Sequence, residues 1–262
     1  MFDLQEIYED AALAAAEAVL GDGLPFPPLP VPRYQPISQN GWRFSQHLIP
    51  AAPGYFYGPQ VLSQPTAILS RGGITWMSLV PMEIESQMPH AAAASGKVVI
   101  CGLGMGVMAY AVAARRAVRQ VVVVERDAEL AAMFQVLAGF DSWPQRDKIE
   151  LVIADARDFR CDDADFLYAD IWPYYRMDEM IIDMQKIHRG CPAPRCGYWG
   201  QEIDMVDWAR AKGCSDFGVG EVGAYISAHH VPLIGADIPG YADLCLLAAQ
   251  NPAIGAVRRP TS

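Results

Sequence analysis

Apolar residues in the middle of the chain occur as short unbroken runs, separated by segments with helical spacing. Residues 98–100 and 121–124 contain only Val and Ile, and such runs are typical of strands buried on both faces of a parallel sheet. Three more strands are predicted at 149–154, 165–170 and 196–200, and helices at 107–118, 128–137, 177–187 and 203–212. We therefore predict an α/β fold with a doubly wound, Rossmann-like parallel sheet, in which strand and helix alternate through five repeats.

The first 95 residues follow a different pattern, which predicts a small β-rich N-terminal domain ahead of a domain at 96–262. The Gly72-Gly73 pair between two apolar runs favours a β-hairpin, and Pro81 begins a helix that extends to His90. Short strands are expected at 42–44, 55–57, 67–69 and 74–76.

The two ends of the chain carry further segments. Residues 1–20 have apolar positions at helical spacing, and residues 24–36 form a proline-rich arm. The arm is either a spacer or, together with the N-terminal helix, a contact for a homodimer or another partner. The tail shows no strand pair and has helical segments at 221–230 and 241–250, so we expect a helical C-terminal tail.

A glycine-rich turn joins the first two strands of the predicted sheet. Gly102, Gly104 and Gly106 follow the first strand, and Glu125 ends the second. This arrangement binds the adenosine part of a cofactor, because glycines let the backbone approach the ligand and a carboxylate accepts hydrogen bonds from ribose hydroxyls. A dinucleotide site would have glycine at the position of Val107, so a nicotinamide cofactor is disfavoured.

Polar residues or glycine follow the later strands as well. Asp155-Ala156 follow the third strand, Asp170 the fourth and Gly200-Gln201 the fifth. Each acid taken singly is equally well a solvated surface residue. Because ligands of open α/β sheets bind at the carboxyl ends of the strands, the successive ends together predict one ligand site.

Composition narrows the expected partners. The chain has 262 residues, 52% of them hydrophobic and 19% charged, with a formal net charge of −10. Such an acidic chain lacks the basic face that grips phosphates, so a nucleic-acid partner is not expected. Acidic residues near the N-terminus disfavour a secretory signal, and no apolar run reaches the length of a membrane span, so a cytoplasmic protein without membrane contact is expected. His188, Cys191 and Cys196 lack a second tight pair of ligands, so no metal site is predicted.

Residues 97–171 resemble the core of the class I S-adenosylmethionine-dependent methyltransferases, through the glycine turn and the acids after the strands. The resemblance implies that the cofactor is S-adenosylmethionine, that Glu125 holds the ribose, and that Asp155 reaches the adenine amino group beside Ala156. It also implies that the glycine turn passes under the methionine part. The cofactor-binding residues expected in this way are Gly102, Leu103, Gly104, Gly106, Glu125, Arg126, Asp155, Ala156 and Asp170.

The hairpin, helix and His90 ahead of the first strand are similar in layout to spermidine synthase-like proteins, in which a small β-rich domain precedes the same core. Aminopropyltransferases have an aspartate where this chain has Met105, a Tyr-His-Glu run where it has Ile84-Glu85-Ser86, and an acidic loop where it has residues 170–176. A cationic polyamine would need several carboxylates at the point of transfer, and this loop offers one acid and three aromatic residues. Methyl transfer to a small-molecule acceptor is therefore expected ahead of aminopropyl transfer.

Asp170 and Tyr174 are the candidate catalytic residues. Methyl transfer is an in-line displacement, and Asp170 is placed to orient or deprotonate the acceptor. Trp172, Tyr175 and Trp76 are expected to bind the acceptor, since aromatic faces also suit a cationic sulfonium. The alternative role for these aromatic residues is packing between the loop and the N-terminal domain. Three histidines without a visible partner are further candidate bases: His90, His229 and His230.

Two other interpretations stay open. The run Asp170-Ile-Trp172-Pro173 resembles the Asp-x-Trp-Pro motif of tRNA guanine-N7 methyltransferases. Those proteins continue with lysines and arginines, whereas this acidic chain continues with Tyr174-Tyr175-Arg176, so the phosphate-binding charge is missing. The second interpretation is a non-catalytic protein that binds S-adenosylmethionine, or only a partner protein, and acts as a scaffold.

Overall fold

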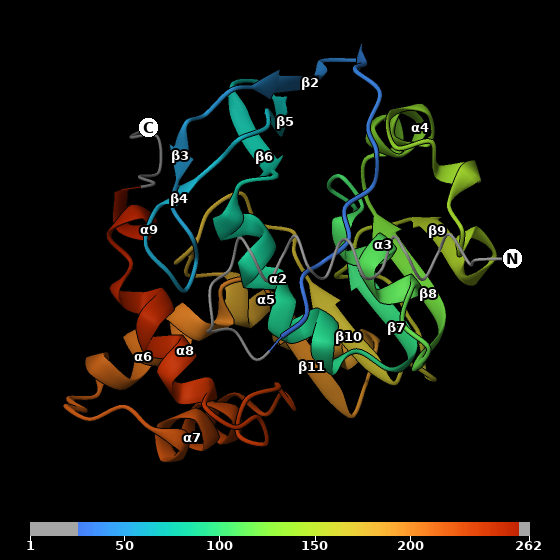
Figure 1. Cartoon of the computed structure of the whole chain (residues 1–262). Helices are drawn as coiled ribbons and strands as arrows, with labels where there is room; N and C mark the ends of the chain where they lie inside the picture. The colour runs from blue at the N-terminus through green and yellow to red at the C-terminus, as the bar shows by residue number, and fades with distance from the viewer. Residues whose placement is uncertain (1–25, 257–262) are drawn as a thin grey trace, which may run out of the picture.

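A computed structural model describes residues 26–256 as a five-stranded parallel sheet with flanking helices, a separate antiparallel sheet, and helices toward the C-terminus (Figure 1). The parallel strands run in the order β11-β10-β7-β8-β9. They are β7 (Gly96–Cys101), β8 (Val118–Glu125), β9 (Ile149–Ile153), β10 (Phe166–Ala169) and β11 (Arg195–Tyr198). The predicted fold class is confirmed, and all five strands lie close to their predicted positions. The helix predicted at 1–20 and the first residues of the arm lie outside the described residues.

Helices connect most of these strands. They are α3 (Val107–Ala113), α4 (Ala128–Leu137), α5 (Met180–Gly190) and α6 (Gln201–Ala211), and short 3-10 turns η1 (Phe140–Ser142) and η2 (Arg146–Lys148) precede β9. The predicted alternation through five repeats is wrong at one place, because residues 154–165 between β9 and β10 form turns without a helix. This connection carries the chain from the β9 edge to the other side of β7. The strand order therefore reverses between β7 and β10, which leaves a crevice at their carboxyl ends.

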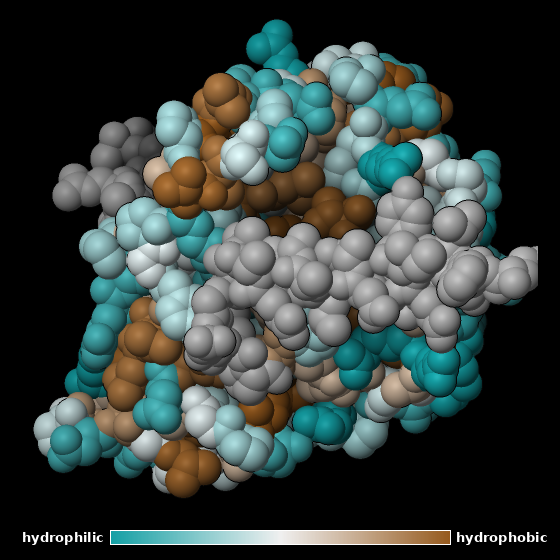
Figure 2. All heavy atoms as spheres, viewed as in Figure 1, coloured by the Kyte–Doolittle hydropathy of each residue, from teal (hydrophilic) through white to brown (hydrophobic). Residues whose placement is uncertain are grey.

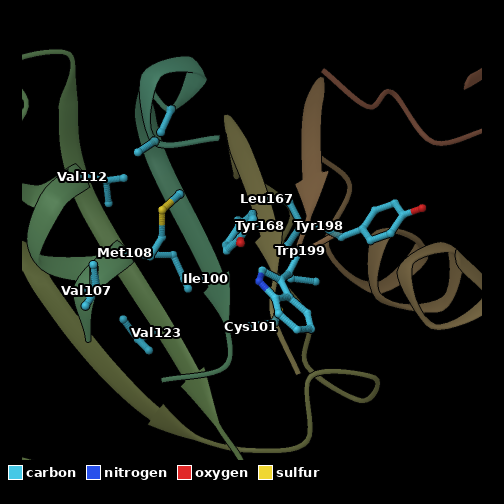
Figure 3. Close-up of a cluster of buried hydrophobic side chains, with 14 of the residues drawn as sticks. Ile100, Cys101, Val107, Met108, Val112, Val123, Leu167, Tyr168, Tyr198 and Trp199 are labelled. Atoms are coloured by element: carbon cyan, nitrogen blue, oxygen red, sulfur yellow. The ribbon is translucent and has the colours of Figure 1, made fainter. Parts of the chain in front are cut away.

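The core of the molecule is one continuous cluster of buried side chains, from Trp42 to Ile254. Figure 3 shows part of it, where Ile100 and Val123 of the central strands lie near Met108 of α3. Burying each aliphatic side chain of this kind stabilises the fold by about 1.5–3 kcal/mol. Because residues on both sides of position 95 share this cluster, the domain boundary at 95/96 stays a prediction.

The N-terminal sheet is antiparallel, in the order β1-β2-β5-β6. Its strands are β1 (Ser38–Gln39), β2 (Trp42–His47), β5 (Thr66–Arg71) and β6 (Ile74–Ser78), and β3 (Ala51–Ala52) pairs with β4 (Gln60–Val61). The predicted hairpin is confirmed: Arg71 pairs with Ile74, and Gly72 and Gly73 have φ angles of 59° and 82°. Both angles are positive, as a two-residue type I′ turn requires.

The strand predicted at 55–57 is wrong. These residues form a bend, in which Tyr55 and Phe56 are buried in the core. Their backbone N–H groups donate to the carboxylate of Glu85, at 2.7 and 2.9 Å, instead of to a neighbouring strand. The apolar run that suggested a strand therefore reflects burial in a loop.

Helix α2 (Pro81–Ala93) connects the two sheets and extends beyond its predicted end at His90. Pro81 stands at its start, where a missing N–H costs nothing. Every residue from Glu85 to Ala91 is buried, so polar as well as apolar side chains of this helix face other protein atoms.

The tail is helical, as predicted, with α7 (Val219–His229), α8 (Tyr241–Gln250) and α9 (Pro252–Ala256). One feature was not predicted. The Cys196 N–H donates to the Pro232 carbonyl and the Ile234 N–H donates to the Cys196 carbonyl, each at 2.8 Å, so the segment around Leu233 extends the parallel sheet beside β11. Within residues 26–256, none of the helices combines the length and the apolar character that a membrane crossing needs.

Candidate active site

The crevice at the carboxyl ends of the parallel strands contains a pocket with a volume of about 180 Å³. Figure 2 shows a recess with apolar walls on the viewed face, in the region between β6 and α3 of Figure 1. The pocket walls include ten residues singled out from the sequence: Trp76, Gly102, Leu103, Gly104, Glu125, Arg126, Asp155, Ala156, Asp170 and Trp172. Side chains that lie up to 96 residues apart in sequence, from Trp76 to Trp172, thus converge on one cavity.

Two glycines of the turn after β7 are required by their surroundings. Gly102 has a φ of 101°, and a Cβ at this position would overlap the carbonyl oxygen of Asp170. Gly106 has a φ of 76° and precedes α3, and a Cβ there would lie 2.6 Å from the Phe134 ring. Glycine therefore lets the turn pass close to the end of β10. Gly106 shapes the turn without bordering the pocket.

Glu125 is buried at the end of β8, with 8% of its surface exposed. Its Oε2 accepts a hydrogen bond from the Leu103 N–H at 3.0 Å, and its Oε1 accepts one from the Asp127 N–H at 2.8 Å. Burial raises the pKa of this carboxyl, and the two backbone donors oppose that rise. The carboxyl is thus fixed between the glycine turn and the start of α4, and each oxygen keeps a lone pair for a ligand.

Asp155 and Ala156 begin the turn after β9. The Arg157 N–H donates to Asp155 Oδ1 at 2.8 Å, and Arg157 Nη1 lies 3.5 Å from the same oxygen. These contacts with Arg157 lower the pKa of Asp155, so the carboxyl is ionised at neutral pH. An ionised carboxylate with a free oxygen accepts a hydrogen bond from an amino group.

The pocket wall formed by the glycine turn, Glu125 and Asp155 fits the adenosine part of S-adenosylmethionine. Such a molecule requires acceptors for its ribose hydroxyls and its adenine amino group, and a backbone that it can approach closely. Glu125 and Asp155 supply the acceptors, and Gly102 and Gly104 supply the bare backbone in the pocket wall.

A second carboxyl lies beside Asp170. Glu83 is in the first turn of α2, and its carboxyl interacts electrostatically with that of Asp170. Burial raises the pKa of both groups, to about 7 for Asp170, and the charge of Asp170 raises the pKa of Glu83 further. With a pKa near 7, Asp170 can take up or release a proton close to neutral pH. Sequence reasoning missed Glu83 because no motif distinguishes it from an ordinary acid in the first turn of a helix.

Two buried polar side chains in the pocket wall have atoms without a hydrogen-bond partner. They are Oε1 of Gln87, which is 1% exposed, and the hydroxyl of Tyr168, which is fully buried. Buried polar atoms are nearly always paired in folded proteins. An unpaired acceptor and an unpaired hydroxyl in a cavity wall therefore mark positions at which a bound molecule completes the hydrogen bonding.

The predicted aromatic residues divide into two groups. Trp172 and Trp76 border the pocket, and the Trp172 indole N–H donates to Asp183 at 3.1 Å. Tyr175 is buried behind the wall, where its ring stacks on Trp199 at 3.8 Å. Tyr174 is half-buried outside the wall as well. The acceptor-binding role of Tyr175 and the catalytic role of Tyr174 stay predictions.

None of the three candidate histidines borders the pocket. His90 is fully buried, with its ring 4.8 Å from that of Tyr168 and its Nε2 3.4 Å from Glu202 Oε1. His229 packs against Tyr225, burial lowers its pKa, and His230 is exposed. Among the described residues, no group of three or more His, Cys, Asp or Glu side chains is arranged to hold a metal ion.

Residues of the N-terminal sheet form one wall of the pocket. Asp127 caps α4 and accepts hydrogen bonds from the Trp42 indole N–H, at 3.2 Å, and from Arg71. The Met105 N–H of the glycine turn donates to the sulfur of Met77 at 3.0 Å. The hairpin β5–β6 is thus attached to the same two turns that carry the predicted cofactor residues.

No protein-family model matches the chain, and no curated protein matches it. Solved structures do match, at low identity and over part of the chain. Spermidine synthase from Thermotoga maritima is 18% identical over 61% of this chain and 62% of its own, with a TM-score of 0.36. A probable spermidine synthase from Corynebacterium glutamicum is 17% identical over 62% of this chain and 61% of its own, with a TM-score of 0.39.

The methyltransferase domain of bacterial CtHen1-CN is 18% identical over 36% of this chain and 49% of its own, with a TM-score of 0.28. The matched region spans less than two thirds of each of these proteins. The two groups that the sequence resembles, spermidine synthases and S-adenosylmethionine-dependent methyltransferases, are therefore both found among the structural matches.

Proposed function

We propose that this chain is an S-adenosylmethionine-dependent methyltransferase that acts on a small-molecule acceptor. The observation that carries the proposal is the convergence of two sets of groups on one pocket. One set is the glycine turn with Glu125 and Asp155, which suits adenosine, and the other is Asp170, which suits proton transfer and interacts electrostatically with Glu83 outside the pocket wall.

The residues of the chain would divide the work as follows. The bound cofactor supplies an electrophilic methyl group. Glu125 and Asp155 orient its adenosine part, so that positioning accounts for much of the rate enhancement. Asp170 takes the proton that the acceptor loses, and burial raises its pKa to about 7, which makes the carboxyl basic enough to do so near neutral pH.

Calorimetric titration with S-adenosylmethionine, its decarboxylated form and NAD tests the cofactor. We expect S-adenosylmethionine to bind and the Glu125→Ala variant to bind at least about 100-fold more weakly, because two charge-assisted hydrogen bonds are lost. Glu150→Ala is the matched control, since Glu150 is exposed on β9 outside this pocket. Absence of binding in the wild type would refute the proposal, and mass spectrometry of acceptor mixtures incubated with the cofactor would then show no added methyl group.

Aminopropyl transfer is the second candidate, and Glu83 is the observation that favours it. The sequence shows one acid in the loop after β10, whereas the structure adds the carboxyl of Glu83 from α2. Two carboxyls at this point are better suited to a cationic amine acceptor than one.

Incubation with the decarboxylated cofactor and putrescine separates the two candidates. Production of spermidine, together with binding of the decarboxylated form alone, would replace methyl transfer by aminopropyl transfer. Binding of S-adenosylmethionine without transfer to any acceptor would leave a non-catalytic cofactor-binding protein.

A further inference from the structure

The buried carboxylate of Asp183 joins the two halves of the pocket. Asp183 lies in α5 and is 9% exposed. Its Oδ1 accepts a hydrogen bond from Arg157 Nε at 2.7 Å, and its Oδ2 accepts from Arg157 Nη2 at 2.5 Å and from Trp172 Nε1 at 3.1 Å. One carboxylate therefore binds a residue from the turn after β9 and a residue from the loop after β10.

Both partners of Asp183 border the pocket, and both donate to Oδ2 of Asp183. Arg157 follows Asp155-Ala156, and its guanidinium and backbone N–H both contact Asp155. Trp172 follows Asp170 by two residues and is 4% exposed. Both contacts of Arg157 with Asp155 are made to Oδ1, which leaves Oδ2 for an amino group. A hydrogen bond to Oδ2 weakens Oδ1 as an acceptor, so it loosens the ion pair with Arg157, and the two-point contact of Arg157 with Asp183 carries that change toward Trp172.

We infer that Asp183 is a positioning residue, which holds the Trp172 indole against the pocket and makes its position respond to occupancy of the turn that contains Asp155. Asp183 contacts neither the pocket nor the reacting groups, and it acts through Trp172 and Arg157. The inference rests on the proposed function, because it takes the ligand at Asp155 to be the adenosine part of the cofactor. Its consequence is that the acceptor side of the pocket takes its final shape after the cofactor has bound.

Nuclear magnetic resonance of the indole N–H groups tests the inference without any acceptor. The chain has six tryptophans, and the Trp172 signal is identified by its loss in Trp172→Phe. In the wild type, we expect titration with S-adenosylhomocysteine to shift the Trp172 signal. In Asp183→Asn, the signal of the free protein should move upfield, since the neutral amide is a weaker acceptor, and its response to the ligand should fall by at least half.

Further variants separate positioning from general damage. Asp183→Asn should weaken binding of S-adenosylhomocysteine by no more than about tenfold, and Asp183→Glu should restore much of the Trp172 response. Arg157→Lys, which loses the two-point contact, should reduce the response while leaving the free Trp172 signal near its wild-type position. Asp237→Asn removes an exposed ion pair with Arg195 and should change nothing.

The outcomes distinguish this inference from the proposed function. If the wild type does not bind S-adenosylhomocysteine, the proposed function fails together with the linkage to Asp155. The Trp172 signals of the two free proteins then decide the holding role alone. If the ligand binds and the Trp172 signal responds equally in the wild type, Asp183→Asn and Arg157→Lys, the inference is overturned and the proposed function stands.

Discussion

The two halves of the pocket are built in different ways. In the cofactor half, the key groups of Gly102, Glu125 and Asp155 lie at or just after the end of a parallel strand, and backbone N–H groups hold both carboxyls. In the proposed acceptor half, Asp170 follows a strand and Gln87 comes from α2, as does Glu83, which interacts with Asp170 from outside the pocket wall. Desolvation raises the pKa of Glu83 and of Asp170 with no backbone donor to oppose the rise, whereas two backbone donors oppose it at Glu125.

Under the proposed function, this difference gives the pocket a rigid binding half and a reactive half. Hydrogen bonds from the backbone keep a buried carboxylate charged, because they offset the loss of hydration. A buried carboxyl without them retains its proton near neutral pH and can exchange it with a substrate. Substitutions that affect both halves, or only one, test whether the division is real.

The largest effect is expected where the two halves touch, at Gly102. Alanine at this position would overlap the Asp170 carbonyl oxygen and would have to adopt a φ of 101°. We expect Gly102→Ala to lower the free energy of unfolding by about 3 kcal/mol and to abolish cofactor binding. Urea denaturation measures the first effect. Gly220→Ala in α7 is the control, because no atom lies within 4 Å of the added Cβ, and equal losses in the two variants would contradict the close contact.

A large effect on the acceptor half alone is expected for Asp170→Asn. Removing the proton acceptor should slow transfer by about 100-fold or more while cofactor affinity changes little. In the wild type, the rate should rise with pH and level off above about 7, because the base acts only after it has lost its proton. Single-turnover rates over a range of pH measure both. A variant that keeps the wild-type rate and pH profile would exclude Asp170 as the base.

A smaller effect, visible in stability, is expected for Glu83→Gln. A carboxyl with a raised pKa binds its proton more tightly in the folded state, so its stabilising contribution is complete below the unfolded pKa and is lost as pH rises through the folded value. The wild type should therefore lose more stability than the variant does as pH rises above 4.5, the ordinary pKa of a glutamate. Urea denaturation at several pH values measures this. Glu150→Gln, which changes an exposed residue, should follow the wild type. Parallel curves of the free energy of unfolding against pH for all three proteins would show that folding does not raise the pKa of Glu83.

The smallest effect is expected where the N-terminal sheet is attached. Arg71 pairs with Asp127 and Glu129 but is 38% exposed, so solvent screens both ion pairs. Arg71→Ala should cost about 0.5–1 kcal/mol of stability and weaken cofactor binding several-fold. Arg43→Ala, which removes another exposed arginine of the same sheet, is the control. An unchanged affinity would show that the hairpin does not contribute to the cofactor half.

Sequence reasoning found the residues at the ends of parallel strands and missed those on helix α2. Glu125, Asp155 and Asp170 each lie at or just after the end of a buried strand, and parallel strands bring all of their carboxyl ends to one edge of the sheet. Glu83 and Gln87 belong to a helix whose side chains have no such rule, and Tyr55 and Phe56 were assigned to a strand because apolar character reports burial and not its cause.

The sequence by itself determined the parallel strands, the hairpin, most of the helices and the residues at the strand ends that line one half of the pocket, because periodicity and strand ends are local properties. The tertiary structure alone decided which residues of α2 join Asp170 and Trp172 in the other half. How α2 lies against β10 depends on packing between the N-terminal sheet and the parallel sheet, through contacts such as Trp42 with Asp127 and Met77 with Met105. Those contacts join residues far apart in sequence, and no local pattern encodes which side chains of a fully buried helix will meet the end of a particular strand.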